Sequence, residues 1–266
     1  GFGDFNSNNF MIGGFMATIG LFAGLSCLFS GFRPEFEIHV HEDSYYAFFE
    51  YIITASLRAA NIIQSCPMAV LRICTRLLYA NHHNSKSYYE RDTLEFHYGV
   101  VDEYRCNYFP ANAYNSPILY ALNSIAPLET LKFVVDFINQ VSQNYKNNPW
   151  QDYAVEEVTL QLPNGQTVTQ LHSLFFWNAY RGTSSPVMPY LIQSVLMALE
   201  KFLLQCGKEF ELSLVEKILL DILSNSKSSM LTAVVASVVV AYPDKFFNVA
   251  CILFQSIEYI AADNLR

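Results

Sequence analysis

The stretch from Leu171 to Cys206 constrains the fold most, because it is dense in apolar residues and has only three ionised side chains: Arg181, Glu200 and Lys201. It is interrupted at residues 182–186. Gly182 can take the left-handed conformation that ends a helix, and Pro186 or Pro189 can begin the next one. We therefore expect a helix, a tight corner and a second helix.

The second helix of this stretch has two apolar sides when its residues are placed at 100° intervals. A wide stripe on one side holds Leu191, Ile192, Val195, Leu196, Leu199, Phe202 and Leu203. Met197 and Leu204 form a smaller patch on the opposite side. Since a helix with two apolar sides needs neighbours on both, the pattern predicts a layer of stacked helices.

The same arrangement of a helix, a proline corner and a second helix recurs elsewhere. Ser116 and Pro117 begin a short helix that ends before Pro127, and Pro127 begins a longer helix that reaches about Tyr145. Near the C-terminus, two serines precede an apolar helix over 230–242, and Pro243 is expected to begin the next helix. We predict a mainly α fold, an irregular α-solenoid of stacked antiparallel helix pairs that is HEAT-like or TPR-like without a consensus repeat.

One β-hairpin is predicted at about residues 158–171, inserted among the helices. Val158 to Leu162 and Gln166 to Leu171 alternate around Pro163-Asn164-Gly165, and Asn-Gly favours a short turn because both residues tolerate positive φ. An isolated hairpin is unstable, so it must pack on the helices. The predicted regions are an apolar glycine-rich segment (1–35), N-terminal helices with an aromatic and polar loop region (36–110), and the helical-repeat region (111–266).

Residues 10–32 leave two interpretations open. The segment has no charge and is long enough to cross a bilayer. Its five glycines oppose a membrane helix, since each lowers helix propensity by about 0.8–1 kcal/mol in water. The segment is therefore either a buried helix or interface, or, as the alternative, the anchor of a membrane-associated protein.

The composition indicates an interaction protein more than a nucleic-acid-binding one. The chain is 52% hydrophobic and 15% charged, whereas about 25% charged is usual, so we expect apolar surface to meet something outside the chain. The net charge of -8 argues against a phosphate-binding surface. Six cysteines without a CxxC pair are expected to be small core residues with free thiols, as in a cytoplasmic protein.

No catalytic motif is present in the sequence. It has no P-loop (GxxxxGK followed by Ser or Thr), no GxGxxG after a strand, no HExxH, no GxSxG and no EF-hand loop. His39 and His41 form an HxH pair that lacks the further ligands of a zinc site. We predict no catalytic residue, no cofactor and no metal, with an enzyme whose site is assembled from distant residues as an open alternative.

Three segments resemble the helical region of very large bacterial STAND-type ATPases such as the AVAST antiphage defence proteins: Leu174–Thr183, Met197–Leu204 and Ala241–Phe247. The similarity runs from about Tyr108 to the C-terminus. In that family, an effector and an ATPase precede long helical repeats that recognise a phage protein and trigger oligomerisation. This chain has no Walker motif and no effector, so the resemblance implies a helical fragment with the ATP chemistry elsewhere.

We therefore expect a non-catalytic helical interaction or sensor module. The chain begins at Gly1 without an initiator Met, which is typical of a fragment of a larger multidomain protein. The expected partner is a protein, either a phage protein or another domain of the same polypeptide, and an oligomer is possible. The candidate interaction residues are Trp177, Tyr180, Arg181, Glu200, Lys201 and Lys245. For Arg181 we also expect a structural role, in which its guanidinium binds the last free carbonyls of a helix and locks the corner.

Overall fold

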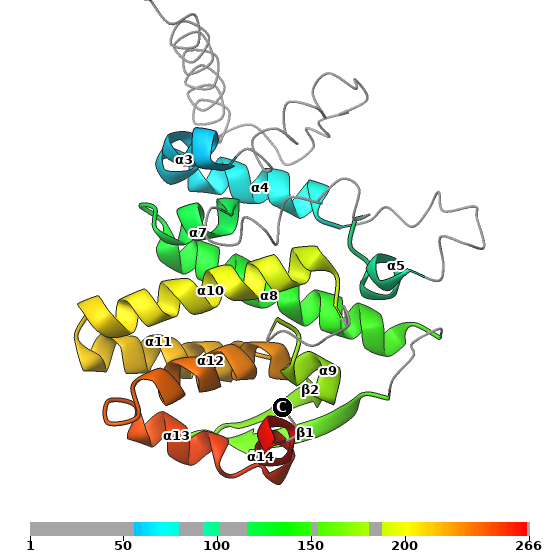
Figure 1. The fold of residues 1–266 in the computed structure, drawn as a ribbon, viewed down its shortest axis with the longest axis vertical. Helices are drawn as coiled ribbons and strands as arrows, with labels where there is room; N and C mark the ends of the chain where they lie inside the picture. Colours follow the sequence, from blue (N-terminus) through cyan, green and yellow to red (C-terminus); the bar gives the residue numbers. More distant parts are fainter. Residues whose placement is uncertain (1–55, 80–92, 102–115, 150–153, 181–187, 265–266) are drawn as a thin grey trace, which may run out of the picture.

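The computed structural model describes residues 56–79, 93–101, 116–149, 154–180 and 188–264, which form a mainly helical fold with a two-stranded antiparallel sheet (Figure 1). The elements in chain order are α3 (Ser56–Ser65), α4 (Pro67–Leu77), α5 (Leu94–Tyr98), α7 (Pro117–Leu122), α8 (Pro127–Asn147), β1 (Glu156–Gln161), β2 (Thr167–His172), α9 (Leu174–Trp177), α10 (Tyr190–Glu209), α11 (Leu212–Asn225), α12 (Ser229–Ala241), α13 (Phe247–Leu253) and α14 (Ile257–Asn264). The predicted mainly α fold with one hairpin is confirmed.

Most helices lie in chain order along the molecule, but the hairpin and α9, which come between α8 and α10 in the chain, lie beside α12 to α14 (Figure 1). The helices α3 and α4 lie at one end and are followed by α7 and α8, then by α10 to α12, and finally by α13, α14 and the hairpin. Helix α10 contacts α7 and α8 as well as α11 and α12. Leu196 and Leu199 of the wide apolar stripe of α10 are fully buried, whereas Met197 and Leu204 of the opposite patch are half-buried.

Local capping explains where several helices begin. Ser116 Oγ accepts a hydrogen bond from the Leu119 N–H at 3.2 Å, and Pro117 is the first residue of α7. Pro127 is likewise the first residue of α8. The first backbone N–H groups of a helix have no acceptor inside the helix. A proline, which lacks an N–H, therefore loses no hydrogen bond at this position. At α12, Ser228 Oγ accepts from the Met230 N–H at 3.3 Å. These predicted starts are confirmed.

One predicted helix start is wrong. Pro243 lies in a turn, and α13 begins only at Phe247. The N–H groups of Lys245 and Phe246 donate to the Tyr242 carbonyl, and tertiary contacts between this turn and α10 hold it.

The hairpin has the predicted position but a different turn. Its register pairs Glu156 with His172 and Gln161 with Thr167. Gly165 has a φ of +81°, whereas no residue other than glycine has a positive φ among those described. Asn164 therefore does not take the left-handed conformation, and the loop is a three-residue one with glycine in the left-handed position.

A buried polar and aromatic cluster attaches the hairpin to the helices. Gln170 Oε1 on β2 accepts hydrogen bonds from Thr232 Oγ1 of α12 at 2.6 Å and from the Tyr259 hydroxyl of α14 at 2.7 Å. The Trp177 ring stacks on the Tyr259 ring with centroids 4.8 Å apart. Three helices and a strand are thus joined by side chains that water does not reach, as expected for a hairpin that needs the helices for stability.

Several predictions concern residues that are not described. They include the apolar segment 10–32, His39 and His41, and the corner at 181–187, although the helices α9 and α10 on either side of that corner are present. Within the described ranges, no helix combines the length and the apolar character needed to cross a membrane. The three predicted regions of the chain stay predictions.

Candidate functional site

The structure brings two of the predicted interaction residues, Tyr180 and Glu200, into contact. Trp177 is buried, and its Nε1–H donates to Asp263 Oδ1 at 3.2 Å. The Tyr180 hydroxyl donates to Glu200 Oε1 at 3.1 Å, which joins the segment after α9 to α10. Lys201 is half-buried, and Arg181 is not described. These contacts are all made within the chain.

Lys245 lies in the turn between α12 and α13 and holds the end of α10. Its Nζ donates to the Gly207 carbonyl at 2.9 Å and lies 5.1 Å from the centroid of the Tyr242 ring. The Tyr242 hydroxyl donates to the Leu204 carbonyl at 2.9 Å. A cation that binds a free carbonyl at a helix C-terminus is the kind of lock that we expected from Arg181.

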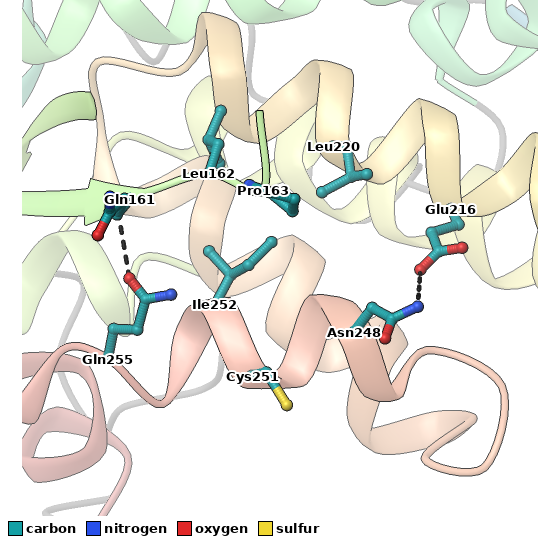
Figure 2. Close-up of a pocket in the computed structure, with 9 residues that line it drawn as sticks. All are labelled: Gln161, Leu162, Pro163, Glu216, Leu220, Asn248, Cys251, Ile252 and Gln255. Atoms are coloured by element: carbon teal, nitrogen blue, oxygen red, sulfur yellow. Dashed lines mark hydrogen bonds between the residues drawn. The ribbon is translucent and has the colours of Figure 1, made fainter. Parts of the chain in front are cut away.

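A groove with a volume of about 490 Å³ lies between the hairpin, α11 and α13 (Figure 2). Its apolar side chains are Leu162 and Pro163 beside the hairpin turn, Leu220 of α11 and Ile252 of α13. Its polar lining consists of Gln161, Glu216, Asn248, Cys251 and Gln255. An apolar centre with a polar rim is the usual composition of a protein contact surface.

Simple periodicity brings these side chains together. Glu216 and Leu220 are four residues apart on α11 and so share one face of that helix. Asn248, Cys251 and Ile252 share a face of α13 by the same spacing rule. The end of β1 and the hairpin turn form the third side of the groove. The alternation of the strand places Leu160 and the following Leu162 inward and Gln161 outward.

Two hydrogen bonds connect the three elements across the groove. The Gln161 backbone N–H donates to Gln255 Oε1 at 3.3 Å, which ties β1 to the end of α13. Asn248 Nδ2 donates to Glu216 Oε1 at 3.0 Å, which ties α13 to α11. Both bonds are drawn as dashed lines in Figure 2. Because the bonded groups are exposed, a partner can replace these bonds without leaving a buried polar atom unpaired.

The groups with shifted pKa values in the described part of the chain lie outside the groove. Burial, with Asp136 nearby, raises the pKa of Tyr79 to about 12. Burial, with Glu209 nearby, raises the pKa of the Cys206 thiol to about 11. Burial also lowers the pKa of His172. These three groups pack in or against the core, and Glu258, whose pKa is lowered by hydrogen bonds from the backbone and from Ser256, does not line the groove either. The groove therefore has the chemistry of a contact surface rather than that of an acid–base site.

Cys251 departs from the expectation that the cysteines are core residues. Cys74 and Cys206 are buried free thiols, as expected, but Cys251 is exposed in the groove. It follows Val249 and precedes Ile252, which take the buried face of the short helix α13. A cysteine between two buried positions of a helix is turned toward solvent by the helical period.

Sequence reasoning missed the groove. Its residues Glu216, Leu220, Asn248 and Gln255 have no distinguishing pattern in the sequence. One signal that could have helped is the alternation of the hairpin, which places Gln161 between the inward residues Leu160 and Leu162. The comparisons add no family: the chain matches no protein-family model, and no curated protein is detectably similar to it in sequence.

Proposed function

We propose that this chain is a non-catalytic helical interaction module and that the groove between the hairpin, α11 and α13 binds a protein partner. The observation that carries the proposal is the apolar centre of Leu162, Leu220 and Ile252 within a polar rim. The turn next to the groove also exposes Phe254 and Ile257, with 69% and 70% of their surfaces accessible. Contiguous exposed apolar surface is typical of a binding site.

An irregular solenoid is part of the same proposal. From α3 to α4, from α7 to α8 and from α10 to α13, neighbouring helices in the chain lie next to one another in Figure 1, whereas α9 and the hairpin lie beside α12 to α14. Stacked helical units of this kind use extended surfaces to bind other proteins.

The biological setting that we propose rests on the resemblance to STAND-type ATPases. In that setting the chain is a cytoplasmic sensor region of a larger antiphage defence protein, and its partner is a phage protein or another domain of the same polypeptide. Oligomerisation would then be a consequence of partner binding. No nucleotide chemistry is assigned to this chain.

The groove supports an interaction module better than an enzyme. A dispersed active site would place several ionisable groups with perturbed pKa values in one deep pocket. The groove instead has one carboxylate, Glu216, and one thiol, Cys251, both in contact with solvent. The alternative of a membrane-associated protein rests on residues 10–32, which lie outside the described residues.

The experiment is a comparative affinity capture from the source cells, with and without phage infection, quantified by mass spectrometry. Leu220→Lys places a charge in the groove, and Leu128→Lys is the matched control because Leu128 is exposed on α8. A partner captured equally by the wild type and by Leu128→Lys, but at least tenfold less by Leu220→Lys, supports the proposal. Equal capture by all three proteins contradicts it, provided that their melting temperatures agree.

A further inference from the structure

The outer side of α13 is apolar, although its inner side is already packed on the molecule. Val249 and Ile252 are buried on the inner side. Phe247 and Phe254 are each 69% exposed, and Cys251 is exposed between them. At 100° per residue, these three exposed positions fall within about 60° of one another around the helix axis. They therefore share one face of the helix.

Phe254 belongs to this face although α13 ends one residue earlier. Its φ of −71° and ψ of −6° are right-handed helical values. Its N–H donates to the Ala250 carbonyl at 2.9 Å, which is a helical hydrogen bond. The helical spacing thus continues through Phe254, and the half-buried Ala250 lies at the edge of the same face. We call Phe247, Ala250, Cys251 and Phe254 the outer stripe of α13.

The outer stripe has the properties of a contact surface. The exposure of Phe247 and Phe254 shows that nothing in the described part of the chain covers them. Helix α13 contains no Asp, Glu, Lys, Arg or His. The last unit of a helical stack usually turns a polar side to water, so exposed phenylalanines on such a helix indicate that another molecule packs there.

The arrangement of side-chain sizes in the stripe is the same in both directions along the helix. The large Phe247 and Phe254 lie at the two ends, and the small Ala250 and Cys251 lie in the middle. Two packed helices are closest where their axes cross and diverge on either side of that point. Small residues at the crossing and large residues beside it therefore fit a second copy of the same helix that runs in the opposite direction.

We infer that the outer stripe of α13 binds a second copy of this chain in a two-fold symmetric, antiparallel helix contact. The two-fold axis passes between Ala250 and Cys251, so Phe247 of each copy packs on Phe254 of the other. A symmetric contact brings each patch onto its own copy, and an uncharged stripe does not repel itself. The inference goes beyond the proposed function, because this contact involves no other protein and lies outside the apolar centre of the groove.

The size of the contact predicts a weak, reversible dimer. Each of the four phenylalanine rings is 69% exposed in the single chain, and a phenylalanine side chain has an area of about 200 Å², so the contact removes on the order of 500 Å² of ring surface from water. Transient complexes bury less than about 1,200 Å² in total. Each chain has a net charge of -8, so the copies repel each other, and salt should strengthen the dimer by screening this repulsion.

Sedimentation equilibrium of the full chain over a range of concentrations tests the dimer. We expect a monomer–dimer equilibrium that tightens at least twofold between about 50 mM and about 500 mM NaCl. Phe247→Glu and Phe254→Lys should each weaken the dimer at least tenfold. Both charges suit their ends of the helix, so α13 should stay folded. Ile125→Glu is the matched control, because Ile125 is 83% exposed in the turn between α7 and α8, and it should leave the dimer unchanged.

An equimolar mixture of Phe247→Glu and Phe254→Lys tests the antiparallel arrangement. In the mixed dimer, the introduced carboxylate lies beside the introduced ammonium group, and the other pair of phenylalanines is intact. The mixture should therefore associate at least fivefold more tightly than either variant alone. A mixture that associates no better than its components would show that the antiparallel contact is wrong.

A short bismaleimide crosslinker tests the position of the axis in the wild type. It adds to two thiols as thioethers, without an oxidant, and should join the two Cys251 side chains that lie beside the axis. Cys251→Ser should abolish the covalent dimer, and Cys66→Ser is the matched control that should retain it. A chain that stays monomeric at all concentrations, or a covalent dimer that persists in Cys251→Ser, overturns the inference. Leu220→Lys should reduce partner capture without changing the dimer, so the two proposals fail separately.

Discussion

At the scale of single residues, Gly207 shows how a tertiary contact overrides helix propensity. A Cβ atom at this position would lie 2.7 Å from Cε2 and 2.9 Å from Cδ2 of the Tyr242 ring. Hydrogen bonding to the Leu204 carbonyl and the Lys245 cation hold that ring in place. We therefore expect Gly207→Ala to lower the free energy of unfolding by about 1–3 kcal/mol, measured by urea denaturation, although alanine is the better helix former.

The control for this prediction is the same substitution in a Tyr242→Ala background. Without the ring, the only remaining effect of Gly207→Ala is the higher helix propensity of alanine, about 1 kcal/mol. The change should therefore become stabilising. A destabilising effect of equal size in both backgrounds would show that the clash with Tyr242 is not its cause.

His172 makes the stability of the protein depend on pH. It packs edge-on against the stacked rings of Trp177 and Tyr259, and burial lowers its pKa, although Glu156 and Glu258 act in the opposite direction. The folded state thus binds this proton less readily than the unfolded state, whose histidine has an ordinary pKa of about 6.5. Protonation therefore favours unfolding, so the stability should fall as the pH decreases through and below about 6.5.

The measurement compares the wild type with His172→Gln at pH 7.5 and pH 5.5. We expect the wild type to lose more free energy of unfolding between these pH values, because glutamine does not titrate. Subtracting the loss measured for His172→Gln from the loss measured for the wild type removes the contribution of all other titrating groups. An identical loss in both proteins would show that the titration of His172 does not affect folding.

At the scale of elements, α12 is the buried centre of the C-terminal half. Val234 and Val235 are fully buried, whereas Val240 on the last turn is 74% exposed. We expect Val234→Ala to lower the free energy of unfolding by about 2 kcal/mol, since it removes buried methyl groups and leaves a cavity. Val240→Ala is the matched control in the same helix and should change stability by less than about 0.5 kcal/mol. Chemical denaturation measures both, and equal effects would contradict the burial of α12.

Sequence reasoning succeeded for elements whose signals are local. The α7 start follows from Ser116 and Pro117, and the hairpin follows from its alternation and Gly165. It failed where contacts between distant residues decide the structure. Pro243 does not begin a helix because Tyr242 and Lys245 bind the end of α10. The groove depends on Gln161 meeting Gln255 and on Glu216 meeting Asn248, and no local pattern records such pairs.

At the scale of the whole molecule, α10 links the two ends of the stack. It packs on α7 and α8 toward the N-terminal helices and on α11 and α12 toward the hairpin. Within the described part of the chain, α7 and α13 share no extensive contact. If the fold behaves as a solenoid, stability is a sum of each unit's own stability and the interfaces with its neighbours.

The proposed solenoid therefore predicts that a destabilising substitution in one helix affects the stability of that helix and its direct neighbours only. Val249→Ala in α13 and Leu196→Ala in α10 each remove fully buried methyl groups and should weaken packing by about 2 kcal/mol or more. Hydrogen exchange of the full chain, followed by mass spectrometry, would report each element separately. With Val249→Ala, exchange should accelerate in α12 to α14 and stay unchanged in α7 and α8, whereas Leu196→Ala should accelerate it on both sides. Equal acceleration of α7 and α13 by Val249→Ala would instead identify a single cooperative core, in which the helices are stacked in sequence but unfold together.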